Sequence, residues 1–180
     1  MTPRRTWAGL ALLLLAAPLG ATAAPPPGAQ ADPFAPLSLY DGDWSVRAKH
    51  PWSGAAEGAS DRLQSRCRRF TLYFACEQTV NGKPQALIVY TVGEAPGRFN
   101  TRTIAPNGLA GARGDLTLEG QHWTYLDKPP AGLTGPWSRV ENVVVDKDHI
   151  RFEEYESSDQ GKTWTQTNAG AEERVGRGRP

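Results

Sequence analysis

The sequence has little of what most directly reveals a function. Its 180 residues include two cysteines, three histidines and one methionine. The histidines, His50, His122 and His149, lie far apart and lack the spacing of metal ligands. We therefore expect turn or surface histidines, no metal site and no cofactor. There is also no Gly-x-Ser-x-Gly nucleophile motif and no phosphate-binding glycine loop, so an enzyme is the least favoured class of function.

The chain also lacks an excess of either basic or acidic residues. The chain has 20 basic and 19 acidic residues, which gives a formal net charge of +1. A protein so close to neutral has no electrostatic reason to bind nucleic acid or an anionic membrane surface. We expect neither as a partner.

Long apolar runs are absent except near the N-terminus. The run from Trp7 to Ala17 follows two arginines and is ended by Pro18 and Gly20, and Ala21-Thr22-Ala23 supplies the small residues that signal peptidase recognises. The run is too short to cross a bilayer, which needs about 20 apolar residues. Residues 1–23 therefore predict a signal peptide, and cleavage near Ala23 predicts a periplasmic or secreted protein without a membrane anchor.

The only two cysteines are Cys67 and Cys76, and neither is placed to carry a lipid at a new N-terminus. If Thr71 and Leu72 form a two-residue hairpin loop, the two cysteines fall directly opposite each other on adjacent strands, near bonding distance. An oxidising compartment favours the bond. We expect a Cys67–Cys76 disulfide, and the alternative is a pair of buried free thiols.

Composition divides the rest of the chain into three parts. Residues 24–33 are rich in proline and alanine and predict a flexible leader. Residues 176–180 read Gly-Arg-Gly-Arg-Pro and predict a disordered tail. One folded domain is expected over residues 34–175. Helix signals are nearly absent from this domain, and the best candidate is a single turn at residues 36–40.

Short runs rich in Val, Thr, Tyr, Phe and Trp, separated by turn dipeptides such as Asn81-Gly82, predict about ten strands. The expected strands are 43–49, 59–69, 72–80, 85–92, 98–104, 114–118, 122–126, 137–145, 149–156 and 163–168. Short links between neighbours favour antiparallel pairing. The predicted fold is all-β, an antiparallel up-and-down barrel of about ten strands that follows a short N-terminal helical turn, and a sandwich is the alternative.

One stretch matches a motif known from sialidases. Residues 157–164 fit the Asp-box pattern Ser-x-Asp-x-Gly-x-Thr-Trp, which resembles repeats of sialidases and other β-propellers, where several copies occur in longer chains. The physics of the motif is local, because Asp159 satisfies the turn backbone, Gly161 supplies a positive φ and Trp164 packs under the hairpin. We expect a structural hairpin here and no sialidase site.

A second motif, Gly42-Asp43-Trp44, resembles the Gly-x-Trp signature of lipocalin-like (calycin) barrels. In those barrels a short helical turn leads into the first strand, and the tryptophan closes the barrel floor under an arginine that comes from the last strand. The resemblance implies that Gly42 and Trp44 are structural and that Arg174 packs on Trp44.

The layout from Leu37 to Val175 also resembles an uncharacterised family of bacterial lipocalin-like domains. Members show Leu-x-x-Leu-x-Gly-x-Trp near the start and an acidic Gly-x-x-Trp hairpin near the end. Here the first leucine is Leu37 and Tyr40 fills the second leucine position. This resemblance implies a barrel fold and no established activity.

Several predicted strands mix polar and apolar residues on one face, as ligand-holding barrels do. On residues 98–104, Thr101 and Thr103 share one face while Arg102 lies on the other. We hypothesise a lipocalin-like carrier or sensor whose partner is a small apolar or amphipathic molecule. Arg102 would pair with an anionic head group, and aromatic residues would hold the apolar body. The candidate ligand-binding residues are Tyr90, Arg102, Trp123, Tyr125, Phe152 and Glu154.

The sequence leaves two other functions open. The barrel could be filled by its own side chains and serve as a structural or interaction module of the cell envelope. An enzyme would need titratable groups that converge in one cavity. The acidic residues Glu153, Glu154 and Glu156 straddle both faces of one strand, which favours a solvated ladder over a glycosidase pair of carboxylates.

Overall fold

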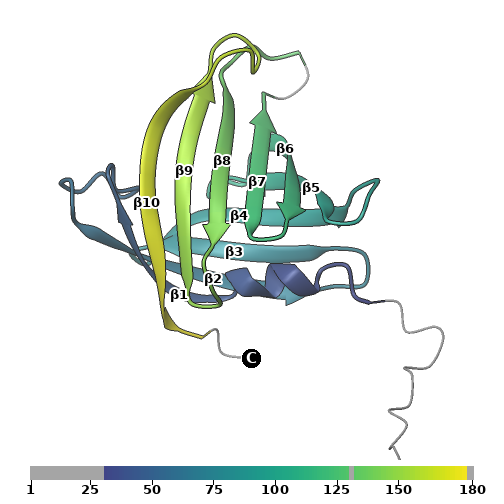
Figure 1. Ribbon diagram of the computed structural model, residues 1–180, viewed down its shortest axis with the longest axis horizontal. Helices are drawn as coiled ribbons and strands as arrows, with labels where there is room; N and C mark the ends of the chain where they lie inside the picture. Colours follow the sequence, from purple (N-terminus) through teal and green to yellow (C-terminus); the bar gives the residue numbers. More distant parts are fainter. Residues whose placement is uncertain (1–30, 130–131, 178–180) are drawn as a thin grey trace, which may run out of the picture. The chain divides into compact units, whose positions relative to one another are not determined.

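The computed structural model describes residues 31–129 and 132–177, which form a closed barrel of antiparallel strands (Figure 1). The 3-10 helix η1 (Ala35–Tyr40) precedes the first strand. The predicted all-β barrel and its short helical turn are confirmed. The predicted signal peptide, most of the predicted leader and residues 178–180 of the predicted tail lie outside the described residues. No helix within the described ranges is long and apolar enough to span a bilayer.

The strands follow one another around the barrel in chain order. They are β1 (Gly42–Ala48), β2 (Ser60–Arg69), β3 (Phe74–Val80), β4 (Lys83–Val92), β5 (Arg98–Ile104), β6 (Ala110–Glu119), β7 (His122–Lys128), β8 (Trp137–Val144), β9 (His149–Ser157) and β10 (Thr165–Gly176). Each pairs with its neighbours in sequence, and β1 also pairs with β10. This last pairing closes the sheet on itself, which removes the open edges that a flat sheet would expose.

A two-residue turn links β3 and β4. Val80 pairs with Lys83 across it. The two turn residues, Asn81 and Gly82, have φ values of 52° and 75°. Positive φ at both positions suits the right-handed twist of the flanking strands, which is why Asn-Gly is favoured at such turns.

The hairpin between β2 and β3 carries the disulfide. The backbone N–H of Phe70 donates to the carbonyl of Tyr73 at 2.8 Å, so Thr71 and Leu72 form the loop. Cys67 pairs directly with Cys76, and the two residues form a disulfide with their Cα atoms 4.0 Å apart. The predicted disulfide is confirmed, and the alternative of free thiols is excluded.

The last strand is longer than the sequence predicted. The prediction ended it at Asn168, whereas β10 continues to Gly176. Residues 169–176 are poor in β-branched side chains and contain two glycines, so their local preference for a strand is weak. Pairing with both β9 and β1 holds them in the sheet. As a result Gly176 belongs to the barrel wall and not to a tail, and Glu172 lies within a strand.

Alternation along each strand sorts side chains into an inside and an outside. Inward residues build two apolar clusters. The first, next to η1, contains Phe34, Leu37, Phe74, Cys76, Tyr90, Phe99, Leu116 and Trp123. The second contains Trp44, Val46, Ala48, Leu63, Val80, Ile150 and Phe152. Leu39 and Tyr40 of η1 pack against both clusters, so the helical turn connects them.

Arg174 ties the helical turn to the barrel. Its guanidinium carbon lies 4.0 Å from the centre of the Trp44 ring. Its Nη1 and Nη2 donate to the carbonyls of Asp41 and Leu39 at 2.5 and 2.7 Å. The arginine therefore stacks on an aromatic face and satisfies carbonyls at the end of η1. We call η1, Gly42, Trp44 and Arg174 the barrel floor.

Gly42 is required by this arrangement. Its φ is 148°, in the region that favours glycine. A Cβ at this position would lie 2.9 Å from the carbonyl oxygen of Gly176 and would collide with the guanidinium of Arg174. The glycine of the Gly-x-Trp motif thus leaves room for the arginine that covers Trp44.

The Asp-box residues form the hairpin between β9 and β10. Asp159 accepts hydrogen bonds from the backbone N–H of Thr163 at 2.8 Å, the Thr163 hydroxyl at 2.7 Å and the Ser157 hydroxyl at 2.8 Å. These bonds, the Thr163 N–H first, lower the pKa of Asp159 to about 2. Gly161 has a φ of 87° and lies close to the Trp164 ring. Every contact of this aspartate stabilises the turn.

Candidate functional site

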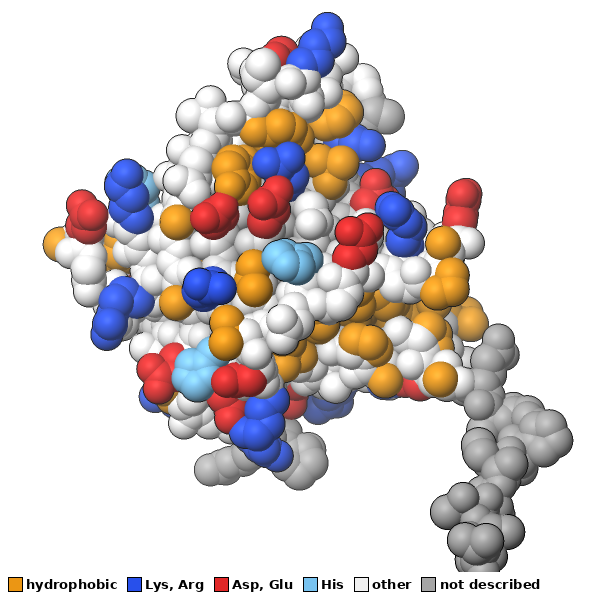
Figure 2. Space-filling view, viewed as in Figure 1, with side chains coloured by type: hydrophobic (Ala, Val, Ile, Leu, Met, Phe, Trp, Pro, Cys, Tyr) orange, Lys and Arg blue, Asp and Glu red, His pale blue; other side chains and the backbone are white. Residues whose placement is uncertain are grey.

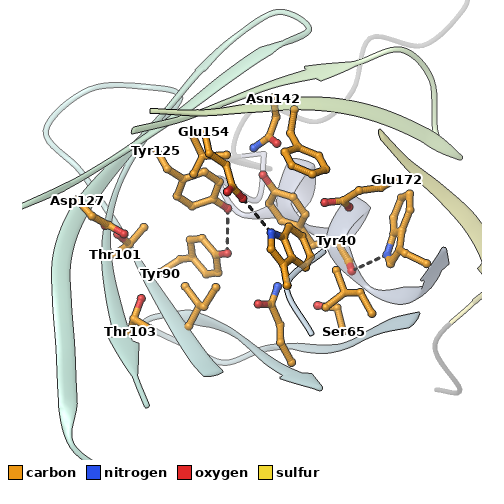
Figure 3. Close-up of a pocket in the computed structure, with 17 residues that line it drawn as sticks. Tyr40, Ser65, Tyr90, Thr101, Thr103, Tyr125, Asp127, Asn142, Glu154 and Glu172 are labelled. Atoms are coloured by element: carbon orange, nitrogen blue, oxygen red, sulfur yellow. Dashed lines mark hydrogen bonds between the residues drawn. The ribbon is translucent and has the colours of Figure 1, made fainter. Parts of the chain in front are cut away.

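The barrel contains a cavity of about 210 Å³, which is partly open to solvent (Figure 3). Its walls come from η1, from the loop between β1 and β2, and from every strand except β6. Members of both apolar clusters line it, together with polar side chains from eight strands and η1. The cavity is therefore the place where side chains from the whole barrel converge.

Three tyrosines meet in the cavity wall. The hydroxyls of Tyr90 and Tyr125 form a hydrogen bond of 3.0 Å, and the ring centre of Tyr40 lies 6.2 Å from that of Tyr125. The Tyr40 hydroxyl oxygen is buried and has no hydrogen-bond partner within the described residues. Burial raises the pKa of all three phenols. They remain protonated and supply aromatic surface together with neutral hydroxyls.

A tryptophan from the loop after β1 forms another part of the wall. Trp52 donates its Nε1–H to Oε1 of Glu154 at 3.0 Å, and its ring centre lies 5.5 Å from that of Phe152. The loop itself is fixed to the barrel, because the N–H of His50 donates to Oδ1 of Asn168 at 2.9 Å and the Asn168 amide donates back to the His50 carbonyl at 3.0 Å. Hydrogen bonds thus fix both the indole and the start of the loop that carries it.

Three carboxyl groups line the cavity, from Asp127 on β7, Glu154 on β9 and Glu172 on β10. Figure 3 shows Asp127 and Glu172 on opposite sides of the space, with Glu154 between them. Among the described residues, those that line the cavity include no lysine, arginine or histidine. The cavity is therefore acidic and has no internal counter-charge.

Glu172 carries the clearest electrostatic signature. Burial, followed by the negative charge of Glu154, raises the pKa of Glu172 from 4.5 to about 7. Its partners on the adjacent strands, Val46 and Ile150, are apolar and each only 1% exposed. No hydrogen bond from these neighbours stabilises the charged carboxylate. The carboxyl of Glu172 therefore changes its protonation state close to neutral pH.

Asp127 occupies space that a glycine on β6 leaves free. Asp127 pairs with Gly114, and a Cβ on Gly114 would collide with the Asp127 carboxyl. Burial, and then the charge of Asp115, raises the pKa of Asp127. This second carboxyl is also held inside the barrel without a basic partner among the described residues that line the cavity.

Carboxylates on the outside of the barrel are in a different situation. Asp43 lies 2.7 Å from Arg66 and 3.5 Å from Arg62. The hydrogen bond from Arg66 holds the pKa of Asp43 below its usual value. Figure 2 shows acidic and basic side chains interspersed over the visible face. The unbalanced charge of the cavity thus contrasts with the balanced charge of this surface.

The structure brings together four of the six predicted ligand-binding residues. Tyr90, Tyr125, Phe152 and Glu154 line the cavity. Trp123 is 6% exposed and packs edge-on against Tyr40 with ring centres 5.3 Å apart, so it belongs to the core beside the cavity. Arg102 is exposed and borders a groove on the outside of β5 with Arg113. It does not reach the interior, because its neighbours Thr101 and Thr103 take the inward positions.

Sequence reasoning missed Glu172 because it ended the last strand at Asn168. A signal for it was present. The expected contact between Arg174 and Trp44 places Arg174 on the inner face, and residues two apart in a strand share a face. Glu172 therefore had to point inward as well. Tyr40, Trp52 and Asp127 were also missed, because a turn, a loop and a strand end gave no periodic pattern that would place their side chains.

The cavity fits an organic ligand better than a metal ion. In the part of the chain that the structure describes, no three His, Cys, Asp or Glu side chains are arranged to bind a metal. The three histidines are exposed, and none of them lines the cavity. Aromatic rings, hydroxyls and isolated carboxyls instead provide the chemistry that recognises small organic molecules.

Comparisons with known proteins add information on the fold. No family model matches the chain, and no curated protein matches it. Among solved structures, the crystal structure of Rv2717c from M. tuberculosis is similar, with 14% sequence identity and a TM-score of 0.50 over 80% of this chain and 98% of that chain. At this identity the likeness concerns the fold alone. The chain therefore has a β-barrel fold that it shares with this M. tuberculosis protein.

Proposed function

We propose that this protein is an exported, lipocalin-like barrel that binds one small amphipathic molecule inside the barrel. The observation that carries the proposal is the interior cavity of about 210 Å³, into which aromatic rings and polar groups converge. Apolar walls with a few placed polar groups are the usual composition of a ligand pocket. A barrel that served only as a scaffold would have no use for buried carboxyls, because each costs free energy to bury without a partner.

The size of the cavity limits the ligand. At ~30 Å³ per water molecule in the liquid, a volume of about 210 Å³ corresponds to about seven waters. A single aromatic ring with a short arm, or a short aliphatic chain, fits this space. A long acyl chain does not fit wholly inside this space, so the part of the ligand that the cavity encloses is short.

Export is supported by two observations. Residues 1–23 have the features of a signal peptide, which are a basic start, an apolar run and a small-residue cleavage site. The Cys67–Cys76 disulfide is typical of oxidising compartments. A periplasmic or secreted location follows from these features as part of the proposal.

A filled barrel that acts as a structural or interaction module of the envelope is the second candidate. The cavity volume favours it, because typical ligand pockets measure ~300–1,000 Å³ and this cavity is smaller. The two candidates differ in what happens when the remaining space is filled. A scaffold tolerates the filling, whereas a binding protein loses its ligand.

Ligand-observed NMR with a library of small amphipathic compounds tests the proposal on a cavity-filling variant. Thr103 lines the cavity, so Thr103→Phe should occupy the space. Asn100 is exposed on the same strand, so Asn100→Phe is the matched outward control. We expect compounds that bind the wild type and Asn100→Phe, and lose binding to Thr103→Phe. Thermal unfolding of both variants checks that each is folded.

Two results would contradict the proposal. One is a library in which no compound binds the wild type, which would favour the filled-barrel scaffold. The other is a set of ligands that bind Thr103→Phe as well as the wild type, which would place binding outside the cavity. Arg102→Ala should leave binding unchanged, because this side chain is on the outer face.

A further inference from the structure

The carboxyl groups inside the barrel have no basic side chain beside them among the described residues that line the cavity. Glu172 forms no hydrogen bond and no ion pair with any described residue, and its wall neighbours on β1 and β9 are Val46 and Ile150. Glu154 accepts one hydrogen bond, from the neutral Trp52 indole. A buried carboxylate without a cation is costly. The nearest arginine along β10, Arg174, is already engaged by the Trp44 ring, Asp148 and backbone carbonyls in the floor.

We infer that the ligand of this cavity is a small organic cation, an amine or quaternary ammonium with a short apolar body, and that Glu172 is the group that binds its charge. This inference rests on the proposed function and specifies its ligand class. It replaces the anionic head group that the sequence suggested through Arg102, since Arg102 lies outside and the carboxyls lie inside.

The wall around Glu172 and Glu154 has the composition that recognises ammonium groups. The rings of Trp52 and Phe152 pack beside Glu154 with their centres 5.5 Å apart. Burial and then Tyr90 raise the pKa of Tyr40, and the nearby charge of Glu172 raises it further. Aromatic faces attract cations through their negative quadrupole, and carboxylates add a full opposite charge. The unpartnered Tyr40 hydroxyl can accept a hydrogen bond from an N–H of the ligand.

A neutral or anionic ligand would leave this charge uncompensated. An anion would lie within a wall that holds three carboxyls and, among the described residues, no basic group. Like charges at short range repel, and the low dielectric of the interior strengthens the repulsion. A metal ion is disfavoured, since Asp127 and Glu172 lie on opposite sides of the cavity in Figure 3 and no metal-binding cluster is found among the described residues.

Binding of a cation should release a proton. The titratable groups that line the cavity with Glu172 are Glu154 on β9, Tyr40 on η1, Tyr90 on β4, and Tyr125 and Asp127 on β7. All are neutral or acidic. An ammonium beside Glu172 lowers its pKa from about 7, so the carboxyl loses its proton as the ligand binds. Affinity for a cation should therefore rise from pH 6 to pH 8.

Isothermal titration calorimetry with three matched compounds tests the inference. Phenethylamine, 2-phenylethanol and 3-phenylpropanoate share a phenyl ring and an ethylene arm and differ in the charge at its end. At pH 8 we expect the amine to bind at least about tenfold more tightly than the alcohol, as one charge-assisted hydrogen bond provides, and the carboxylate not to bind. At pH 6 the amine should bind about tenfold more weakly than at pH 8, since Glu172 is then mostly protonated.

Two variants assign the effect to one side chain. Glu172→Gln keeps the shape and removes the charge, so the preference for amine over alcohol should fall to about twofold or less. Glu173→Gln removes the adjacent charge, which is exposed on the outer face of β10, and should keep the full preference. Circular dichroism confirms that both variants are folded.

Each outcome decides one of the two proposals. If the alcohol or the carboxylate binds as tightly as the amine, the cation inference is overturned and the binding function stands. If none of the three compounds binds at either pH, the cation inference is overturned, and the NMR library then decides the binding function on its own. If Glu172→Gln keeps the amine preference, the assignment of the charge to Glu172 is overturned.

Discussion

The barrel floor and the cavity each contain a charged side chain from β10, but only the charge in the floor has partners within the protein. In the floor, the charge of Arg174 is covered by the Trp44 ring, balanced by Asp148 and bonded to backbone carbonyls. In the cavity, the carboxyl of Glu172 has apolar neighbours and a like charge nearby. Both residues lie on the inner face of β10, two positions apart.

This difference separates stability from function. A charge whose partners all come from the chain stabilises the fold, because folding supplies those partners. A charge left without a partner destabilises the fold, and a site that binds a ligand is where such a cost is commonly found. The floor therefore explains how the barrel closes, and the cavity is the basis of the function that we propose.

The largest effect is expected from the floor. Arg174→Ala removes the stacking on Trp44 and leaves the carbonyls of Asp41 and Leu39 without donors. We expect a loss of about 3 kcal/mol in the free energy of unfolding, from charge-assisted hydrogen bonds and cation–π stacking together. Urea unfolding measures it. Arg177→Ala, an exposed arginine just beyond β10, should change stability by less than about 0.5 kcal/mol, and an equal loss in both variants would contradict the role given to Arg174.

The disulfide should have the next largest effect. Cys76 is fully buried in the cluster next to η1, and the bond closes a loop with a sequence separation of 9. The double variant Cys67→Ser, Cys76→Ser should lose about 2–3 kcal/mol, the chain-entropy value for a short loop. Chemical unfolding with and without a reductant provides the check, because the reductant should destabilise the wild type and leave the double variant unchanged. A wild type insensitive to reductant under unfolding conditions would contradict the expectation.

The cavity should show a smaller effect of opposite sign. Since folding raises the pKa of Glu172 from 4.5 to about 7, the carboxyl contributes stability below pH 4.5 that is lost as the pH rises through 7. The full linkage is ~3 kcal/mol, and partial solvent contact of the side chain reduces it to about 1–2 kcal/mol. Glu172→Gln should therefore be more stable than the wild type at pH 8 and about equal at pH 4.

Thermal unfolding across this pH range distinguishes the cause. Glu173→Gln should follow the wild type at every pH, because Glu173 is exposed on the outer face. Destabilisation by Glu172→Gln at pH 8 would mean that the charge has a partner within the protein, and would remove the contrast between cavity and floor.

Much of the fold could be predicted from residues that lie close together in the chain. The disulfide was predicted because Cys67 and Cys76 lie equally far from a loop at Thr71 and Leu72. The turn between β3 and β4 was predicted from its Asn81-Gly82 dipeptide alone. The barrel followed from short links between many strands. These features depend on residues close together in the chain, where a single sequence carries enough information.

The cavity was only partly predictable, because its content depends on pairings between distant segments. The strand β10 persists beyond Asn168 through partners on β1 and β9, and neither is visible from local propensity. The guanidinium of Arg102 is suited to an anionic ligand, and only the register of β5 shows that it lies on the outer face of the barrel. The volume left inside a barrel depends on how all inward side chains pack together, so the ligand class that we propose could be inferred only from the fold.

Native mass spectrometry of the protein isolated under non-denaturing conditions from the cells that make it tests the central claim most directly. We predict a population that carries one small molecule per chain, positively charged when released, and no such population for Thr103→Phe prepared in the same way. The bare mass alone for the wild type, or the same adduct on Thr103→Phe, would contradict the claim that this barrel binds a ligand in its cavity.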